Sequence, residues 1–405
     1  MPRARPWRFL VPVLRSAPVV FSVALLARLR ILSELLPDSE QRYFYQYNEP
    51  ARIAWALVSG FGYSSPWPHT PLAPTAQQPP LYPYLLAGIF RLTGAYTLTS
   101  LWIAVGLNAV VSAFTAVLIL RLAKQTLGEP TAILAAWLWS CWLYEAVVSV
   151  RLWESCLSAF LLTVALLLLP KLARSPRILD YMLLGALAGL ASLNNTTLLA
   201  VFPFFWIWLW VSGRTGKSTR KLILASLATC VLIILPWTIR NYETFHRLIP
   251  VRDNFGLELW IGNHEGVTNR FPTDFPLIDP TEFNRLGEIR FMEAKRDIAF
   301  QFIRTHPVEF ARLSTRRMLK FWVDPGGVVW IVSLLAWTGL AVFVWRERFA
   351  AFPYAAVMIF FPLAYYVTHT FSTYRHPIEP VVVILASYAL VTAISKLMSL
   401  SSRNT

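Results

Sequence analysis

Long apolar runs, separated by polar segments of two kinds, set the pattern of this chain. A helix that crosses a membrane needs about 20 mostly apolar residues. By that criterion the sequence predicts an all-α polytopic membrane protein with about ten transmembrane helices. The expected spans are residues 17–36, 99–121, 130–148, 154–170, 179–194, 198–212, 221–238, 328–345, 351–369 and 377–396.

The polar segments between these runs differ in length and charge. Short basic segments, the N-terminal arginines and the C-terminal tail all fall on one side of the predicted membrane. Lys and Arg collect in short cytoplasmic loops, so this side is expected to be cytoplasmic. The two long segments, 38–98 and 239–327, are then expected outside, with both termini inside. The basic segments are RLAK at 121–124, KLARSPR at 171–177, GRTGKSTRK at 213–221, WRER at 345–348 and the tail SKLMSLSSR.

Both long outer segments are expected to contain helices at the membrane surface. Residues 81–92 are apolar but too short to cross a bilayer, which predicts an interfacial helix. The later part of 239–327 places apolar residues at helical spacing between charges, a pattern typical of amphipathic surface helices. The run PWPHTPLAPTAQQPP is flanked by aromatic residues, so we expect it to be extended and packed.

Composition supports a single membrane domain over residues 1–405. The chain is 56% hydrophobic and 15% charged, whereas soluble proteins average about 45–50% apolar and about 25% charged residues. Basic loops account for the net charge of +15, so nucleic acid is not an expected partner. The six histidines form no HxxH or HExxH pair, and neither a metal nor a cofactor is expected.

Three acids are candidates for a proton acceptor near the outer face. Glu49 precedes Pro50, a residue favoured in the first turn of a helix, where a carboxylate also suits the helix dipole. Asp38 follows the first span directly, and Glu154 opens the fourth. Each has an ordinary alternative: a helix cap for Glu49, a surface acid for Asp38, and an ion pair with Arg151 for Glu154.

Four basic residues are also predicted near the outer face, against the usual charge bias of outer loops. Arginine matches phosphate oxygens well, so a phosphate group is the expected partner, with lipid head groups in general as the alternative. These residues are Arg240, Arg252, Arg375 and His376. Neighbouring polar and aromatic residues are expected to line a substrate pocket, namely Tyr45, Tyr47, Tyr82 and Asn254.

Several segments together resemble the integral-membrane glycosyltransferases of the GT-C superfamily. The likeness is greatest to the bacterial members of the family that includes protein O-mannosyltransferases and aminoarabinose transferases. It covers most of the chain and is weakest in the amphipathic part of the second outer segment. The segments are ARIAWALVSGFGYSSP, PTAQQPPLYPYLLAGIFRLTG, LNAVVSAFTAVLILRLAKQTLG, WESCLSAFLL, PWTIRNY, IPVRDNFGLELWIGN and YRHPIEP.

This resemblance implies a multi-pass inner (plasma) membrane enzyme that transfers a sugar from a polyprenyl-phosphate carrier at the extracytoplasmic face. The acceptor would be a lipid, glycan or protein, and configuration at the sugar carbon would invert. An acid of the first outer segment would be the base, and outer arginines would hold the lipid phosphate. The chain departs from the family pattern at Gln46, where Asp is common, while Glu49 matches the second acid. We therefore expect Glu49 to be the base, ahead of Glu154 and Asp38.

Two other functions are compatible with a polytopic membrane protein. A transporter or flippase of lipid-linked sugars would be expected to show internal repeats and helices broken at the midplane. The sequence shows no such symmetry, and its polar residues concentrate outside the spans. A non-catalytic membrane scaffold would accommodate the departure at Gln46. The transferase remains the favoured hypothesis.

Overall fold

The computed structural model describes residues 10–35, 45, 48–67, 70–212, 216–267, 278–324 and 326–401. Within these ranges the regular structure is helical, apart from one isolated bridge between Ser64 and Pro74. The predicted all-α class is therefore confirmed. The helices are α1 Leu10–Leu14, α2 Ala17–Leu35, α4 Glu49–Val58, α5 Leu81–Thr93, α6 Leu98–Leu127, α7 Glu129–Cys141, α8 Leu143–Ser149, α9 Ser155–Arg174, α10 Ile178–Asn194, η2 Thr196–Ala200, α11 Phe202–Ser212, α12 Gly216–Phe245, α13 Phe255–Gly262, α14 Pro280–Leu286, α15 Glu288–Thr305, α16 Pro307–Val323, α17 Val328–Phe360, α18 Leu363–Val367, η3 Ser372–Ile378 and α19 Glu379–Ser401.

Helices occupy all of the apolar runs that the sequence marks as spans. Five helices in the described ranges are long and apolar enough to cross a membrane, or six if the bent pair α7 and α8 forms one span. α10 and α11 are shorter apolar helices. α17 departs from helical geometry at Glu347 (φ −143°, ψ 62°), between the predicted spans 328–345 and 351–369. The count of about ten spans stays a prediction.

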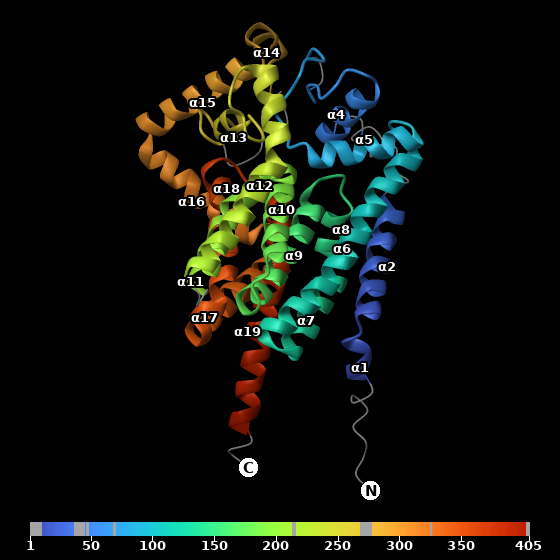
Figure 1. The fold of residues 1–405 in the computed structure, drawn as a ribbon, viewed down its shortest axis with the longest axis vertical. Helices are drawn as coiled ribbons and strands as arrows, with labels where there is room; N and C mark the ends of the chain where they lie inside the picture. Colours follow the sequence, from blue (N-terminus) through green and yellow to red (C-terminus); the bar gives the residue numbers. More distant parts are fainter. Residues whose placement is uncertain are drawn as a thin grey trace.

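The two long outer segments meet at one end of the helical bundle (Figure 1). α4, α5, α13 and α14 lie at the top of the view, whereas α1 and the last turns of α19 lie at the opposite end. This arrangement agrees with the segregation that the basic loops predict. A helix is present at 81–92 as α5, and the amphipathic region contains α15 and α16. Their location at a membrane surface stays a prediction.

Glycines allow two helix pairs of the bundle to approach closely. A Cβ at Gly185 of α10 would lie 2.0 Å from the Ser226 carbonyl oxygen of α12. One at Gly339 of α17 would lie 2.0 Å from the Leu385 carbonyl oxygen of α19. Lipid is as apolar as the helix surfaces, so close van der Waals contact at small residues, rather than the hydrophobic effect, holds such pairs together.

Hydrogen bonds fix the proline-rich run against the second outer segment. Glu288, the first residue of α15, accepts from Thr75 Oγ1 at 2.5 Å and from the Ala76 backbone nitrogen at 2.6 Å. Arg240, near the end of α12, donates to the carbonyl oxygens of Thr75 at 2.7 Å and Tyr63 at 3.0 Å. Residues 75–80 of the run are therefore packed, as its aromatic flanks predict, whereas Pro71, Ala73 and Pro74 are exposed.

Candidate functional site

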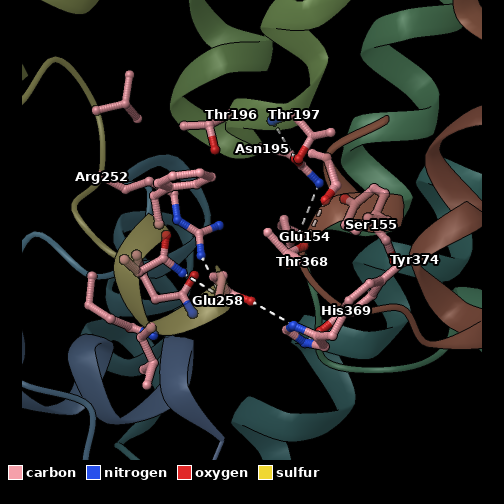
Figure 2. Close-up of a pocket in the computed structure, with 18 of the residues that line it drawn as sticks. Glu154, Ser155, Asn195, Thr196, Thr197, Arg252, Glu258, Thr368, His369 and Tyr374 are labelled. Atoms are coloured by element: carbon pink, nitrogen blue, oxygen red, sulfur yellow. Dashed lines mark hydrogen bonds and ion pairs between the residues drawn. The ribbon is translucent and has the colours of Figure 1, made fainter. Parts of the chain in front are cut away.

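A cavity of about 540 Å³ lies where the two outer segments meet the ends of several helices. Figure 2 shows its polar side chains arranged around an open centre. Carboxylates, amides, hydroxyls and one guanidinium face the same space, so the cavity is suited to a polar or charged ligand. Its wall is formed by Glu49 of α4, Trp67, Gln77 and Gln78, residues 153–155 at the start of α9, and side chains from within 195–200 around η2, 250–261 and 364–377.

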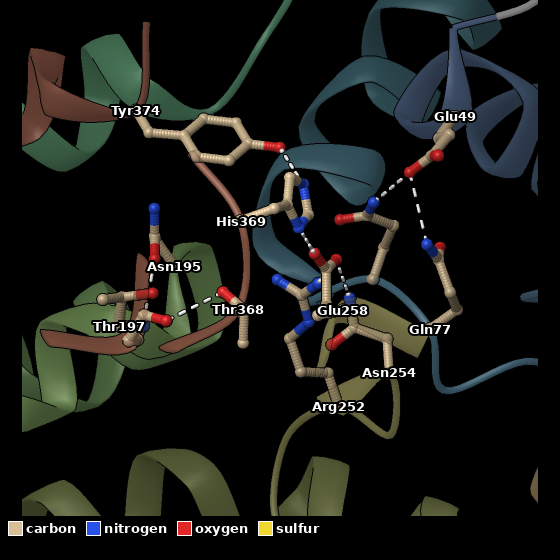
Figure 3. Close-up of polar contacts among 12 residues, drawn as sticks. Glu49, Gln77, Asn195, Thr197, Arg252, Asn254, Glu258, Thr368, His369 and Tyr374 are labelled. Carbon is tan, nitrogen blue, oxygen red and sulfur yellow. Dashed lines mark hydrogen bonds and ion pairs between the residues drawn. The ribbon is translucent and has the colours of Figure 1, made fainter. Parts of the chain in front are cut away.

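Glu49 lines one wall, with its carboxylate held by two amides. Pro50 stands in the first turn of α4, as predicted, so Glu49 opens that helix. Gln77 Nε2 donates to Glu49 Oε2 at 3.3 Å, and Gln78 Nε2 donates to the same oxygen (Figure 3). Burial raises the pKa of Glu49 above its ordinary value, and the two amide donors oppose that shift because they stabilise the ionised form.

Glu154 lines another wall and lies just outside the span that begins with Ser155 of α9. Asn195 Nδ2 donates to Glu154 Oε1 at 3.4 Å (Figure 2). Burial raises the pKa of Glu154 to about 8, although its own backbone amide and the positive charge of Arg252 act in the other direction. At neutral pH the Glu154 carboxyl is therefore mainly protonated and offers a hydrogen-bond donor to the cavity.

A row of polar contacts starts at Arg252 and ends at Tyr374 (Figure 3). Arg252 Nη2 donates to Glu258 Oε1 at 3.2 Å, and Asn254 Nδ2 donates to the same oxygen at 2.5 Å. The second oxygen of Glu258 lies 3.3 Å from His369 Nδ1. His369 Nε2 lies 3.1 Å from Tyr374 Oη. All five residues line the cavity, so a cation, a carboxylate, an imidazole and a phenol share it.

The other predicted phosphate ligands lie outside the cavity lining and have protein partners. Arg240 donates hydrogen bonds to the backbone carbonyl oxygens of Thr75 and Tyr63. Arg375 is buried, with its guanidinium against Glu379, four residues further along the chain. His376 is also buried, and its Nδ1 lies 2.6 Å from Glu145 Oε2. Contact of these three residues with a phosphate stays a prediction.

The predicted substrate-pocket residues are divided between the cavity and the protein interior. Asn254 lines the cavity. Tyr45 and Tyr82 are buried outside the lining: Tyr45 Oη lies 3.2 Å from Ser100 Oγ, and Tyr82 Oη accepts from Asn108 Nδ2 at 3.1 Å. Three positions singled out in the sequence lie outside the described residues, namely Asp38, Gln46 and Tyr47.

Sequence analysis did not single out most of the lining residues, and five of these make the polar contacts described above, namely Gln77, Gln78, Glu258, His369 and Tyr374. Four of them do fall in segments that carry the family resemblance, PTAQQPP, FGLELWIGN and YRHPIEP, which is a signal that could have been used. His369 falls in none of those segments. Its place beside Glu258 depends on the packing of α13 against the end of α18, which no local pattern encodes.

No three His, Cys, Asp or Glu side chains are grouped so that they could hold a metal ion, within the ranges that the structure describes. The expected absence of a metal or cofactor stays a prediction. Arg252 is better placed to bind an anion. Its buried Nε–H has no acceptor among the described residues, and a phosphate oxygen is the kind of acceptor that guanidinium groups bind.

Comparisons with known proteins extend the description of the fold. Residues 77–239 match the family described as dolichyl-phosphate-mannose-protein mannosyltransferase. A solved oligosaccharyltransferase of Archaeoglobus fulgidus, in complex with zinc and sulfate, is 15% identical, with 93% of this chain and 49% of that chain covered and a TM-score of 0.56. The AglB oligosaccharyltransferase of the same organism, in complex with an inhibitory peptide and a dolichol-phosphate, is 14% identical, with 95% and 51% covered and a TM-score of 0.53.

A third solved structure is ArnT from Cupriavidus metallidurans bound to undecaprenyl phosphate. It is 14% identical, with 95% of this chain and 60% of that chain covered and a TM-score of 0.50. No curated protein matches the chain. At such identities the likeness concerns the fold alone, and the chain spans only about half to three fifths of the length of these structures.

Proposed function

We propose that this chain, which has the fold and the family match of a GT-C membrane glycosyltransferase, transfers a sugar from a polyprenyl-phosphate carrier to a hydroxyl or amine acceptor at the extracytoplasmic face. One observation carries the proposal: the Glu49 carboxylate and the Arg252 guanidinium line the same cavity. A reaction that takes a proton from an acceptor and leaves negative charge on a phosphate uses a base and a cation together.

Glu49 is the proposed base. The acceptor oxygen or nitrogen bonds to the anomeric carbon of the sugar while the bond from that carbon to the phosphate oxygen breaks. The acceptor proton passes to Glu49, and the phosphate oxygen retains the bonding electrons. A single displacement of this kind inverts the configuration at the sugar carbon. Burial raises the pKa of Glu49, which makes its carboxylate a stronger proton acceptor, and the amides of Gln77 and Gln78 keep it oriented.

Arg252 is the proposed phosphate ligand among the outer basic residues, because it lines the cavity and has a buried N–H without a protein acceptor. Charge that develops on the departing phosphate is stabilised by donors already in place. Burial raises the pKa of Glu154 to about 8, so its carboxyl is mainly protonated at neutral pH and is proposed as a donor to the phosphate rather than a second base. Two carboxyl groups with different surroundings thus take different roles.

The ligands of the structural neighbours support a polyprenyl-phosphate donor. AglB was solved with a dolichol-phosphate and ArnT with undecaprenyl phosphate. Both ligands are polyprenyl monophosphates, the product expected when a sugar leaves such a carrier. An acceptor peptide is bound in one of the oligosaccharyltransferase structures. For this chain the acceptor class, whether lipid, glycan or protein, is left to experiment.

Mass spectrometry of envelope lipids, polysaccharides and proteins, from cells with and without the chain, identifies the product. We expect one sugar modification to disappear and the corresponding polyprenyl-phosphate sugar to accumulate. The purified chain in detergent should then restore the transfer when given that donor and that acceptor. A flippase would fail the second step, because detergent provides no membrane across which to move a lipid. Unchanged sugar content in all three fractions would contradict the proposal.

A further inference from the structure

Glu258, His369 and Tyr374 form a row of contacts that the proposed transfer does not yet use (Figure 3). Glu258 lies on α13, His369 follows α18, and Tyr374 lies in η3. The imidazole stands between the other two side chains, with Nδ1 3.3 Å from Glu258 Oε2 and Nε2 3.1 Å from Tyr374 Oη. Each of the three side chains lines the cavity. Their protonation therefore decides which hydrogen-bond donors and acceptors a bound ligand contacts.

The hydrogen positions in this row follow from counting donors and acceptors. Glu258 Oε2 lies 3.3 Å from Nδ1 in an ion-pair contact, and its negative charge favours a hydrogen on the ring nitrogen that faces it. A neutral imidazole has one N–H, and Nε2 must then accept a hydrogen bond from the Tyr374 hydroxyl. In this state Tyr374 presents only lone pairs to the cavity. An anion beside it would meet no donor from this side chain.

A second proton on His369 reverses the contact with Tyr374. The imidazolium Nε2–H donates to the phenol oxygen, and the phenol hydrogen is then free for a group in the cavity. We infer that Glu258 and His369 set the direction of the Tyr374 hydroxyl and thereby couple binding of the lipid phosphate to uptake of one proton. This inference rests on the proposed function, because it requires the phosphate of the carrier to lie in this cavity.

Several charged groups act on the imidazole. Glu258 favours the imidazolium, whereas Arg317 of α16 and Arg252 oppose it. Burial is the largest effect and lowers the pKa of His369 below its ordinary value, which Glu258 offsets in part. In the empty cavity at neutral pH the ring is therefore mainly neutral. A bound anion that favours the imidazolium then draws a proton from solvent, by the reciprocity of linked equilibria.

The coupling distinguishes the two forms of the lipid. The sugar-bearing phosphate is a diester with one negative charge, whereas the released phosphate is a monoester that can carry two. The product therefore favours protonated His369 more than the donor does. Glu258 and His369 are positioning residues that act through Tyr374, and they favour the charge that develops on the phosphate as the bond to the sugar breaks.

Calorimetry on the purified full-length chain tests this inference, with undecaprenyl phosphate as the probe. Binding heats at pH 7 in two buffers of different ionisation enthalpy give the number of protons taken up. We expect the wild type to take up more protons per bound lipid than His369→Asn or Tyr374→Phe does, with a difference of at most about one proton. Each variant should bind roughly ten- to hundredfold more weakly, and the double variant no more weakly than either.

The controls distinguish failure of this inference from failure of the proposed function. Protonation of the lipid phosphate itself occurs with every variant and cancels in the comparison. His246→Asn changes an exposed histidine outside the cavity and should keep the wild-type proton uptake. Tyr374→Phe removes one oxygen and keeps the ring, so it provides the test if His369→Asn does not fold.

Equal proton uptake in all proteins, or additive losses of affinity in the double variant, would overturn the inference alone. Failure of the wild type to bind the lipid would overturn the proposed function as well.

Discussion

Gln78 donates its side-chain amide hydrogen to Glu49 Oε2, and this bond joins the proline-rich run to the first turn of α4. Gln77 reaches the same oxygen at 3.3 Å. The run that contains both glutamines is in turn held by Glu288 and Arg240. The position of the proposed base therefore depends on residues that lie roughly two hundred positions further along the chain.

Gln78→Ala should shift the pH dependence of transfer. The amide hydrogen favours the ionised form of Glu49, so its loss should raise the pKa of that carboxyl further. A base is lost as pH falls through its pKa, and the acidic limb of the pH–rate profile should therefore move to higher pH. Gln301→Ala, at an exposed position of α15, should leave the profile unchanged. Identical acidic limbs for Gln78→Ala and the wild type would show that this amide does not act on the base.

Arg252→Ala should weaken binding of undecaprenyl phosphate. Hydrogen bonds to charged groups contribute about 1.5–3 kcal/mol, which corresponds to a loss of roughly ten- to hundredfold in affinity. Calorimetric titration of the purified variant measures this directly. Arg312→Ala, at an exposed arginine of α16 outside the cavity, is the control and should bind as the wild type does. Unchanged affinity in Arg252→Ala would exclude this guanidinium as the phosphate ligand.

Arg240→Ala should act mainly on stability. The change leaves the carbonyls of Thr75 and Tyr63 without this donor and removes the guanidinium from the rings of Tyr63 and Trp237. An unsatisfied buried carbonyl costs about 1–3 kcal/mol, so the thermal unfolding midpoint in detergent should fall. A normal midpoint combined with lost lipid affinity would instead assign Arg240 to the phosphate.

Glu288 should make stability depend on pH. Burial raises its pKa from 4.5 to about 7, so between these values the folded chain binds more protons than the unfolded chain. Stability should then be greatest at the acidic end of this window and fall as pH rises through it, by on the order of 3 kcal/mol in all. Unfolding midpoints measured from pH 5 to 8 should no longer show this fall with rising pH in Glu288→Gln. They should still show it in Asp297→Asn, an exposed control on the same helix.

The placement of the outer segments can be tested by cysteine labelling in intact cells. Cys141 is exposed and is first replaced by Ser. An impermeant maleimide should then label Gln301→Cys on α15 directly and Ser175→Cys, between α9 and α10, only after permeabilisation. The opposite pattern would invert the topology and place the cavity on the cytoplasmic side.

Much of the fold could be predicted from the sequence because helix formation in a membrane is a local property. Apolar length and basic loops located the helices and grouped the two outer segments. The first turn of α4 was also predictable, since Pro50 and the preceding acid are local signals. The break in α17 at Glu347 falls in the basic WRER segment, where the sequence predicted a loop between two apolar runs.

The site was less predictable because its contacts join distant segments. Arg375 was expected at a phosphate, but it packs against Glu379, and their spacing of four residues was a helical signal for that pairing. Arg240 contacts a backbone carbonyl of Tyr63 and the ring of Trp237, which come together only in the folded chain. The contact between Glu258 and His369 spans more than a hundred positions, and neither residue carries a local motif for it.

The transfer rate of Glu49→Gln tests the central claim most directly. Gln keeps the size of the side chain but cannot accept the proton, and loss of a general base typically reduces rate by about 100- to 10,000-fold. The account predicts a loss of this size with folding and undecaprenyl phosphate binding intact, while Glu309→Gln, at a solvent-accessible site on α16, transfers normally. Transfer by Glu49→Gln at the wild-type rate would contradict the account.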